Sequence, residues 1–88
     1  MIIIDYDRHP RHLPKDAAEK WADWFRRYGI DPSMISAGTR ITVRQNAVTT
    51  VEWWAAPGDF RMVWQARTRR FPTDVDDPPT GYRTEVRP

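Results

Sequence analysis

The chain has 88 residues and a formal net charge of +2, and 12% of its residues are aromatic. This length suits one small domain, in which buried aromatic side chains supply much of the apolar area. The absence of cysteine excludes disulfides and thiolate zinc sites, and because there is no long apolar run we expect a cytoplasmic protein without a membrane span or secretory signal.

The first third of the chain predicts a strand followed by one helix. The β-branched run that begins at Ile2 predicts a short strand ending at Tyr6, and a polar loop follows it. From Pro14 to Ile30, apolar residues recur at three- and four-residue steps, which is typical of an amphipathic helix. Pro14 suits the first turn, and Gly29 suits a left-handed stop. The apolar stripe comprises Ala17, Ala18, Trp21, Ala22, Trp24, Phe25 and Tyr28.

Three further strands are predicted after a turn at Asp31 and Pro32, with short turns at Gln45–Asn46 and Pro57–Asp59 between them. They are Thr39–Arg44, Ala47–Ala55 and Phe60–Thr68. The sequence therefore predicts an α+β fold, with one amphipathic helix packed on a three- to four-stranded antiparallel β-meander.

Strand side chains alternate between the two faces of a sheet, so each strand can be assigned a core side. In the second of these strands we expect Val51 and Trp53 to face the helix and Trp54 to point away from it. In the third, we expect Trp64 to lie on the core side together with Phe60, Met62 and Ala66.

The composition changes after Phe71. Residues 1–71 are predicted to form a single compact domain, and residues 72–88 a tail rich in proline and aspartate. Tyr82, Thr84 and Val86 alternate, so the end of this tail is a candidate for an added edge strand.

No catalytic or cofactor site is predicted. The group Asp5, Asp7, His9 and His12 combines carboxylates with imidazoles, which can hold a divalent cation, but Pro10 interrupts it and no further ligand cluster accompanies it. The four glycines are scattered, which excludes a glycine-rich phosphate loop. We therefore expect no enzyme activity, no metal and no cofactor.

The strongest candidate surface is an aromatic surrounded by arginines. If Trp54 points outward, it has arginines on the neighbouring strands, a composition enriched at binding hot spots. The predicted partner-binding residues are Trp54, Arg40, Arg44, Arg61 and Arg67. We expect this surface to bind a protein or a second copy of the chain, and the alternative is a nucleic-acid-binding face built on the arginines.

The run WFRRYGIDPSMISAGTRITVR, followed by VTTVEWW, resembles small orphan proteins encoded by bacteriophages of actinobacteria. The resemblance covers roughly Ala17 to Trp54 and depends mainly on Gly29, Ile30, Asp31 and Pro32. It implies a helix, a tight turn and a strand hairpin in a non-catalytic module that binds a host or phage component. It carries over no catalytic residues.

Overall fold

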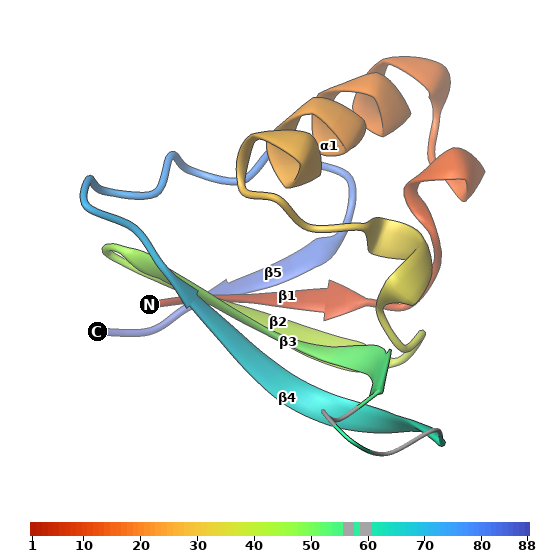
Figure 1. Cartoon of the computed structure of the whole chain (residues 1–88). Helices are drawn as coiled ribbons and strands as arrows, with labels where there is room; N and C mark the ends of the chain where they lie inside the picture. The colour runs from red at the N-terminus through yellow and green to blue at the C-terminus, as the bar shows by residue number, and fades with distance from the viewer. Residues whose placement is uncertain (56–57, 59–60) are drawn as a thin grey trace.

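The computed structural model describes residues 1–55, 58 and 61–88. It shows one helix packed on a five-stranded antiparallel sheet, in the strand order β4-β3-β2-β1-β5 (Figure 1). The predicted α+β class is confirmed, and the sheet has more strands than the three or four expected. The elements are β1 (Ile2–Tyr6), α1 (Lys15–Arg27), β2 (Thr39–Arg44), β3 (Ala47–Ala55), β4 (Met62–Arg70) and β5 (Arg83–Val86), with short 3-10 helices at Pro10–His12 and Pro32–Met34.

The helix forms where the apolar stripe predicted it. Trp21, Trp24 and Phe25 are its buried residues, and they face the sheet core. Gly29 ends it with a φ of 66°. The Gly29 N–H bonds to the carbonyl of Arg26 at 3.1 Å and the Ile30 N–H to that of Phe25 at 2.9 Å, which together make a Schellman cap. Glycine is required at this position because a left-handed φ is costly for other residues.

The core side of β3 differs from the prediction by one residue. Val43 of β2 faces the helix and pairs directly with Val48, so Val48, Thr50 and Glu52 share the buried face of β3. The expectation that Val51 and Trp53 face the helix is therefore wrong. The alternation was misassigned because two of the three inward residues are polar.

The same shift applies to β4, since Trp53 pairs directly with Trp64. Trp64, Met62 and Ala66 therefore lie on the sheet face opposite the helix, which we call the outer face. Phe60, Pro57 and Asp59, which were assigned to the third predicted strand and its turn, lie outside the described residues.

Residues 72–88 wrap the helix and then join the sheet. The indole N–H groups of Trp21 and Trp24 donate to the carbonyls of Thr80 and Asp76 at 2.9 and 3.2 Å. β5 then pairs antiparallel with β1, and the Arg87 N–H donates to the Met1 carbonyl at 2.8 Å. The two termini consequently lie side by side (Figure 1).

Candidate functional site

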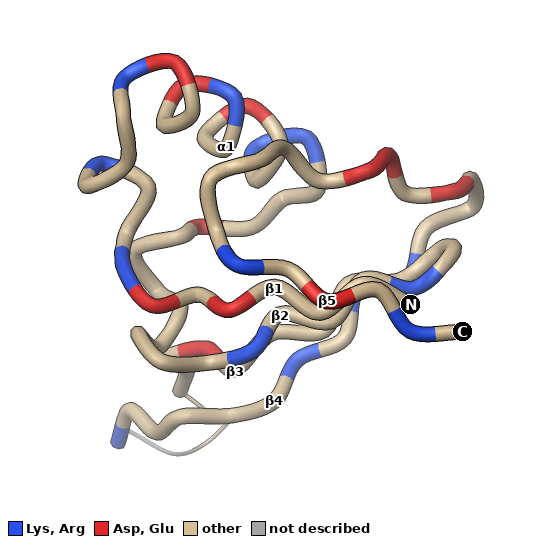
Figure 2. Tube along the Cα trace, turned by 180° about the vertical axis from the view of Figure 1, so that it is seen from behind, with Lys and Arg blue, Asp and Glu red and all other residues tan. Residues whose placement is uncertain are grey.

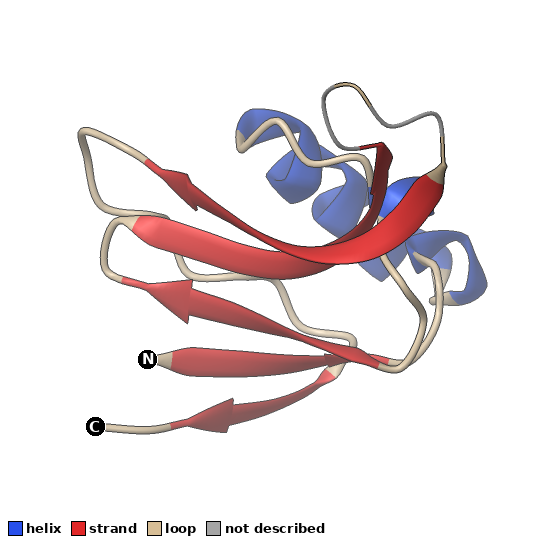
Figure 3. Cartoon of the chain, turned by 60° about the horizontal axis from the view of Figure 1, so that its bottom comes forward, coloured by secondary structure: helices blue, strands red, loops and turns tan. Residues whose placement is uncertain are grey.

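The β3–β4 hairpin, of which residues 47–55, 58 and 61–70 are described, carries most of the exposed large hydrophobic side chains in the described part of the chain. Figure 3 shows it as the longest pair of strands, at the edge of the sheet. Of the seven large hydrophobic side chains that are exposed in the described part of the chain, five belong to this hairpin. We call these five residues the hairpin patch: Trp53, Trp54, Met62, Val63 and Trp64.

On the outer face, the patch is centred on a pair of tryptophans. Trp53 and Trp64 lie directly opposite each other, with ring centroids 4.7 Å apart and planes tilted by 58°. Their exposed fractions are 37% and 51%. A cross-strand aromatic pair stabilises a hairpin by about 0.2–1 kcal/mol, and here it also leaves indole surface in contact with water.

On the helix side, the patch continues at Trp54, which is 38% exposed. Trp54 is in phase with the buried residues Thr50 and Glu52, but it lies farther along β3, near the tip of the hairpin. It lines a hollow of about 260 Å³ together with residues of the edge strand β4. The other lining residues are Gln65, Ala66, Arg67 and Thr68.

The predicted ring of arginines around Trp54 does not form. Arg40 and Arg44 project from the outer face of β2, whereas Trp54 and Arg67 lie on the helix side. The misassigned phase of β3 is the physical reason, because it placed Trp54 on the wrong face. Arg61 precedes β4 and is exposed. Of the predicted partner-binding residues, only Trp54 and Arg67 line the same hollow.

The outer face also mixes the two signs of charge. Asp5 of β1 lies opposite Arg40 of β2 on one side and Arg83 of β5 on the other. Figure 2 shows these acidic and basic positions alternating across neighbouring strands. This part of the sheet is therefore not a continuous basic surface.

A buried ion pair anchors the hairpin to the rest of the sheet. The guanidinium of Arg69 donates to both carboxylate oxygens of Glu52, at 2.7 and 2.9 Å, and the Thr50 hydroxyl donates to the same carboxylate at 2.5 Å. The side chains of Arg69 and Glu52 are only 13% and 5% exposed. The sequence analysis did not predict this network. The signal available for it was the spacing of Thr50 and Glu52, two polar residues two positions apart and therefore on the same face of β3.

Opposing effects act on the pKa of Glu52. Burial, the largest single effect, raises this pKa. It is outweighed by the combined lowering effect of the hydrogen bonds from Arg69 and Thr50 and of the positive charges of Arg69 and Arg67, so the pKa lies below its ordinary value. Glu52 is therefore held as a carboxylate at neutral pH.

The residues considered for a metal site are engaged elsewhere. Asp7 forms an ion pair with Arg8 at 2.9 Å. His9 Nδ1 accepts a hydrogen bond from the backbone N–H of Arg11, and burial is the main cause that lowers the pKa of His9. His12 Nε2 accepts from the Arg11 side chain at 3.3 Å. Across residues 1–55, 58 and 61–88, no group of three His, Asp or Glu side chains is placed to hold a metal ion.

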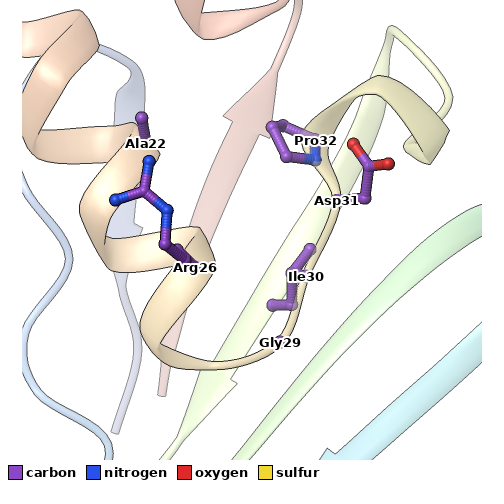
Figure 4. Close-up of a pocket in the computed structure, with 6 residues that line it drawn as sticks. All are labelled: Ala22, Arg26, Gly29, Ile30, Asp31 and Pro32. Atoms are coloured by element: carbon purple, nitrogen blue, oxygen red, sulfur yellow. The ribbon is translucent and has the colours of Figure 1, made fainter.

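A second hollow, of about 440 Å³, lies between the end of α1 and the segment that follows it (Figure 4). Its two charged residues are already paired with neighbours. Arg26 donates to Asp23 at 2.9 Å, and the Asp31 carboxylate accepts from the N–H and hydroxyl of Ser33 at 3.0 and 2.6 Å. These contacts stabilise the turn locally, which leaves the hairpin patch as the better candidate site.

No protein-family model, no curated protein and no solved structure matches this chain. In the described part of the chain, no helix has the length and apolar character needed to cross a membrane.

Proposed function

We propose that the chain is a non-catalytic protein-interaction module, encoded by a bacteriophage, that binds a host or phage protein in the host cytoplasm. The hairpin patch is its contact surface. The observation that carries this proposal is the gathering of Trp53, Trp64 and Met62 on the outer face of one hairpin, next to Trp54 and Val63 on its other face.

The energetics favour an interface at this position. Burying apolar surface contributes roughly 25 cal/mol per Å², and tryptophan is the side chain most enriched at interface hot spots. The two indoles of the outer face are held in contact by the strand register, so their ordering is largely complete before a partner binds. A pre-organised aromatic pair loses little conformational entropy on association.

The chain itself is one possible partner. Two copies can bury their Trp53–Trp64 pairs against each other across a two-fold axis, since an isologous contact uses the same patch twice. Sedimentation velocity over a range of protein concentrations separates this homodimer from a monomer that binds another protein.

The second candidate function, nucleic-acid binding, rests on the outer face alone. Arg44 and Arg70 flank Ala47 in one row across three strands, on the same face as Trp53 and Trp64. Bases stack on exposed indoles and phosphates pair with guanidinium groups. However, Asp5 and Glu85 share this face, and Arg67 lies on the other side of the sheet.

The test compares two variants of the sheet in affinity capture from cell lysate, with and without nuclease treatment. Trp53→Ala/Trp64→Ala removes the tryptophan pair from the outer side of the hairpin patch, whereas Val86→Ala truncates a side chain that is 77% exposed at the opposite edge of the sheet. We expect the double variant to lose partner capture or self-association and Val86→Ala to retain it.

Salt separates the two candidate functions. An aromatic-centred protein interface weakens little between low and moderate salt, whereas phosphate binding weakens steeply. Capture that disappears with nuclease, or that falls steeply with salt, would reject the protein-interaction function.

A further inference from the structure

We propose that the open edge of β4 binds an acidic extended peptide by strand addition, so that the partner segment becomes a sixth strand of the sheet. This inference rests on the proposed interaction function and names the chemical class of the partner. The segment it fits alternates apolar residues with glutamate or aspartate.

The backbone of β4 forms one edge of the sheet. This strand has nine residues and pairs with β3 from Ala47↔Arg70 to Ala55↔Met62, and among residues 1–55, 58 and 61–88 no strand pairs with its other side. At the opposite edge of the sheet, β5 has only four residues. A long open edge presents a row of backbone donors and acceptors to which an extended peptide can add.

β4 also carries an excess of positive charge. Within Met62–Arg70 there are three arginines and no acidic residue. Glu52 neutralises Arg69, but among the described residues no carboxylate lies within ion-pair distance of Arg67. Arg67 is exposed on the helix side of the edge, so a carboxylate arriving there gains a charge-assisted contact.

The hollow beside Trp54 has both an apolar and a charged lining residue. Three of its lining residues, Trp54, Gln65 and Arg67, share the helix side of the hairpin. An indole at one side of a hollow and a guanidinium at another match a glutamate side chain, whose methylene groups pack on the ring while its carboxylate pairs with the arginine. Volume, apolar wall and charge thus indicate the same side chain.

The outer face of β4 determines which residues should alternate with the acidic residues of the peptide. The outward residues of β4 next to the open edge are mostly apolar or uncharged, namely Met62, Trp64, Ala66 and Thr68. Residues of an added strand alternate between the two faces. Acidic residues on the helix side therefore require apolar residues on the outer side, where they extend the Trp53–Trp64 surface.

A second copy of β4 is a poorer occupant of this edge. In a fully overlapping antiparallel pair of β4 strands, Arg67 of one copy lies opposite Gln65 of the other. Because β4 contains three arginines and no acidic residue, a second copy supplies no carboxylate to Arg67 and adds positive charge to an already positive edge. Arginine at an edge strand works against self-pairing while it leaves the edge open to an acidic chain.

The experiment uses synthetic peptides of about seven residues, the reach of a short strand. One peptide alternates valine with glutamate, and its matched control alternates valine with lysine. A third peptide has the acidic sequence but carries N-methyl groups on every second backbone amide. These groups remove the N–H donors that would hydrogen-bond to β4. Binding is measured by NMR titration of the full chain, together with amide hydrogen exchange.

We expect the acidic peptide to bind at least about tenfold more tightly than the lysine peptide, because its glutamates can pair with Arg67 and lysines cannot. A tenfold difference in affinity corresponds to about 1.4 kcal/mol. Binding of the acidic peptide should slow hydrogen exchange at alternate β4 amides, those that face the open edge. The N-methylated peptide should leave the exchange rates of these amides unchanged. Arg67→Glu should weaken the acidic peptide at least about tenfold, whereas Arg40→Glu, on the outer face of β2, should change its affinity by less than about threefold.

Three results would overturn the inference: equal affinity for the acidic and lysine peptides, no β4 protection at saturation, or protection that depends on protein concentration without peptide. The last would identify a second copy as the occupant. β4 protection by a single-stranded oligonucleotide in place of the acidic peptide would identify nucleic acid. If the peptide fails while capture still requires Trp53 and Trp64, only the edge inference falls and the interaction function remains.

Discussion

The two ends of the sheet use tryptophan in opposite ways. On the sheet-facing side of α1, Trp21 is fully buried and packs at 4.9–5.5 Å centroid distances on Trp24, Phe25 and Tyr82. In the hairpin, Trp53 and Trp64 pack on each other and expose their remaining surface. Within β4, Gln65 and Arg69 are half-buried and the other residues are exposed. The difference indicates that stability is concentrated in the helix-covered half and that the hairpin is available for binding.

This division has a structural cause. The helix, the segment at residues 72–82 and the indole hydrogen bonds all lie over β1, β2 and the first part of β3. β3 and β4 continue beyond this cover, and the Glu52–Arg69 pair ties the helix side of β4 to the buried part of β3. Substitutions in the two halves should therefore differ in their effect on stability.

The largest effect is expected from Trp21→Ala. Truncating a fully buried tryptophan costs about 3–5 kcal/mol, a large part of the stability of a small domain. Chemical denaturation followed by circular dichroism measures the loss. A cooperative melt within a few degrees of wild type would show that the helix does not supply the stabilising core.

The next largest effect concerns the Glu52–Arg69 pair. Removing one partner of a buried pair leaves an unpaired charge and costs about 3–5 kcal/mol, so Glu52→Gln and Arg69→Met should each destabilise strongly. The double variant should cost less than the sum of the two, because neither charge remains. A double-mutant cycle on unfolding free energies measures this coupling, and strict additivity would mean that the pair does not tie the hairpin to the core.

The same pair predicts a pH dependence. The folded pKa of Glu52 lies below its ordinary value of 4.5, so its contribution is fully present above that value. It is lost as the pH falls below 4.5 and through the folded pKa. Melting temperatures of wild type should therefore fall more steeply in this range than those of Glu52→Gln/Arg69→Met. If melting temperature fell with pH equally steeply in the wild type and the double variant, the pH dependence would not come from the Glu52–Arg69 pair.

A smaller effect is expected where residues 72–82 pass the helix. Gly81 has a φ of 134°, and an added Cβ would lie 3.3 Å from atoms of Leu13 and Trp21. Gly81→Ala combines backbone strain with overpacking and should cost about 1–3 kcal/mol. Gly38→Ala is the matched control, because its φ of 87° is also positive but its Cβ would meet open space. If Gly81→Ala and Gly38→Ala lowered the unfolding free energy equally, residues 72–82 would be loosely packed where they pass the helix.

The comparison also shows what the sequence can predict. The helix and its end follow from a strong local pattern, the 3.6-residue stripe and Gly29. In β2, the buried residues Ile41 and Val43 likewise alternate with more polar neighbours. These elements need no information from distant residues.

The phase of β3 needs such information. The burial of Glu52 is compensated by Arg69, 17 residues beyond it, whose guanidinium pairs with the carboxylate, and the Thr50 hydroxyl donates to the same carboxylate. Read locally, Val51 and Trp53 are the more hydrophobic pair, and they took the core side in the prediction. The place of β1 between β2 and β5 is likewise set by pairing across most of the chain, which no local pattern reveals.

The smallest effect on stability is expected from Trp54→Ala. Trp54 belongs to the same strand face as buried Thr50 and Glu52, yet it retains 38% exposure near the hairpin tip. Its truncation should therefore lower the unfolding free energy by no more than about 1 kcal/mol, as is usual for a side chain outside the core. It should nevertheless weaken binding of the valine–glutamate peptide, because it removes the apolar wall of the β4 hollow. Val63→Ala, opposite Trp54 on the same face but not a lining residue of the hollow, is the control for a general loss of apolar surface. A stability loss as large as that of Trp21→Ala would place Trp54 in the core, and the hairpin would then be part of the stabilising half.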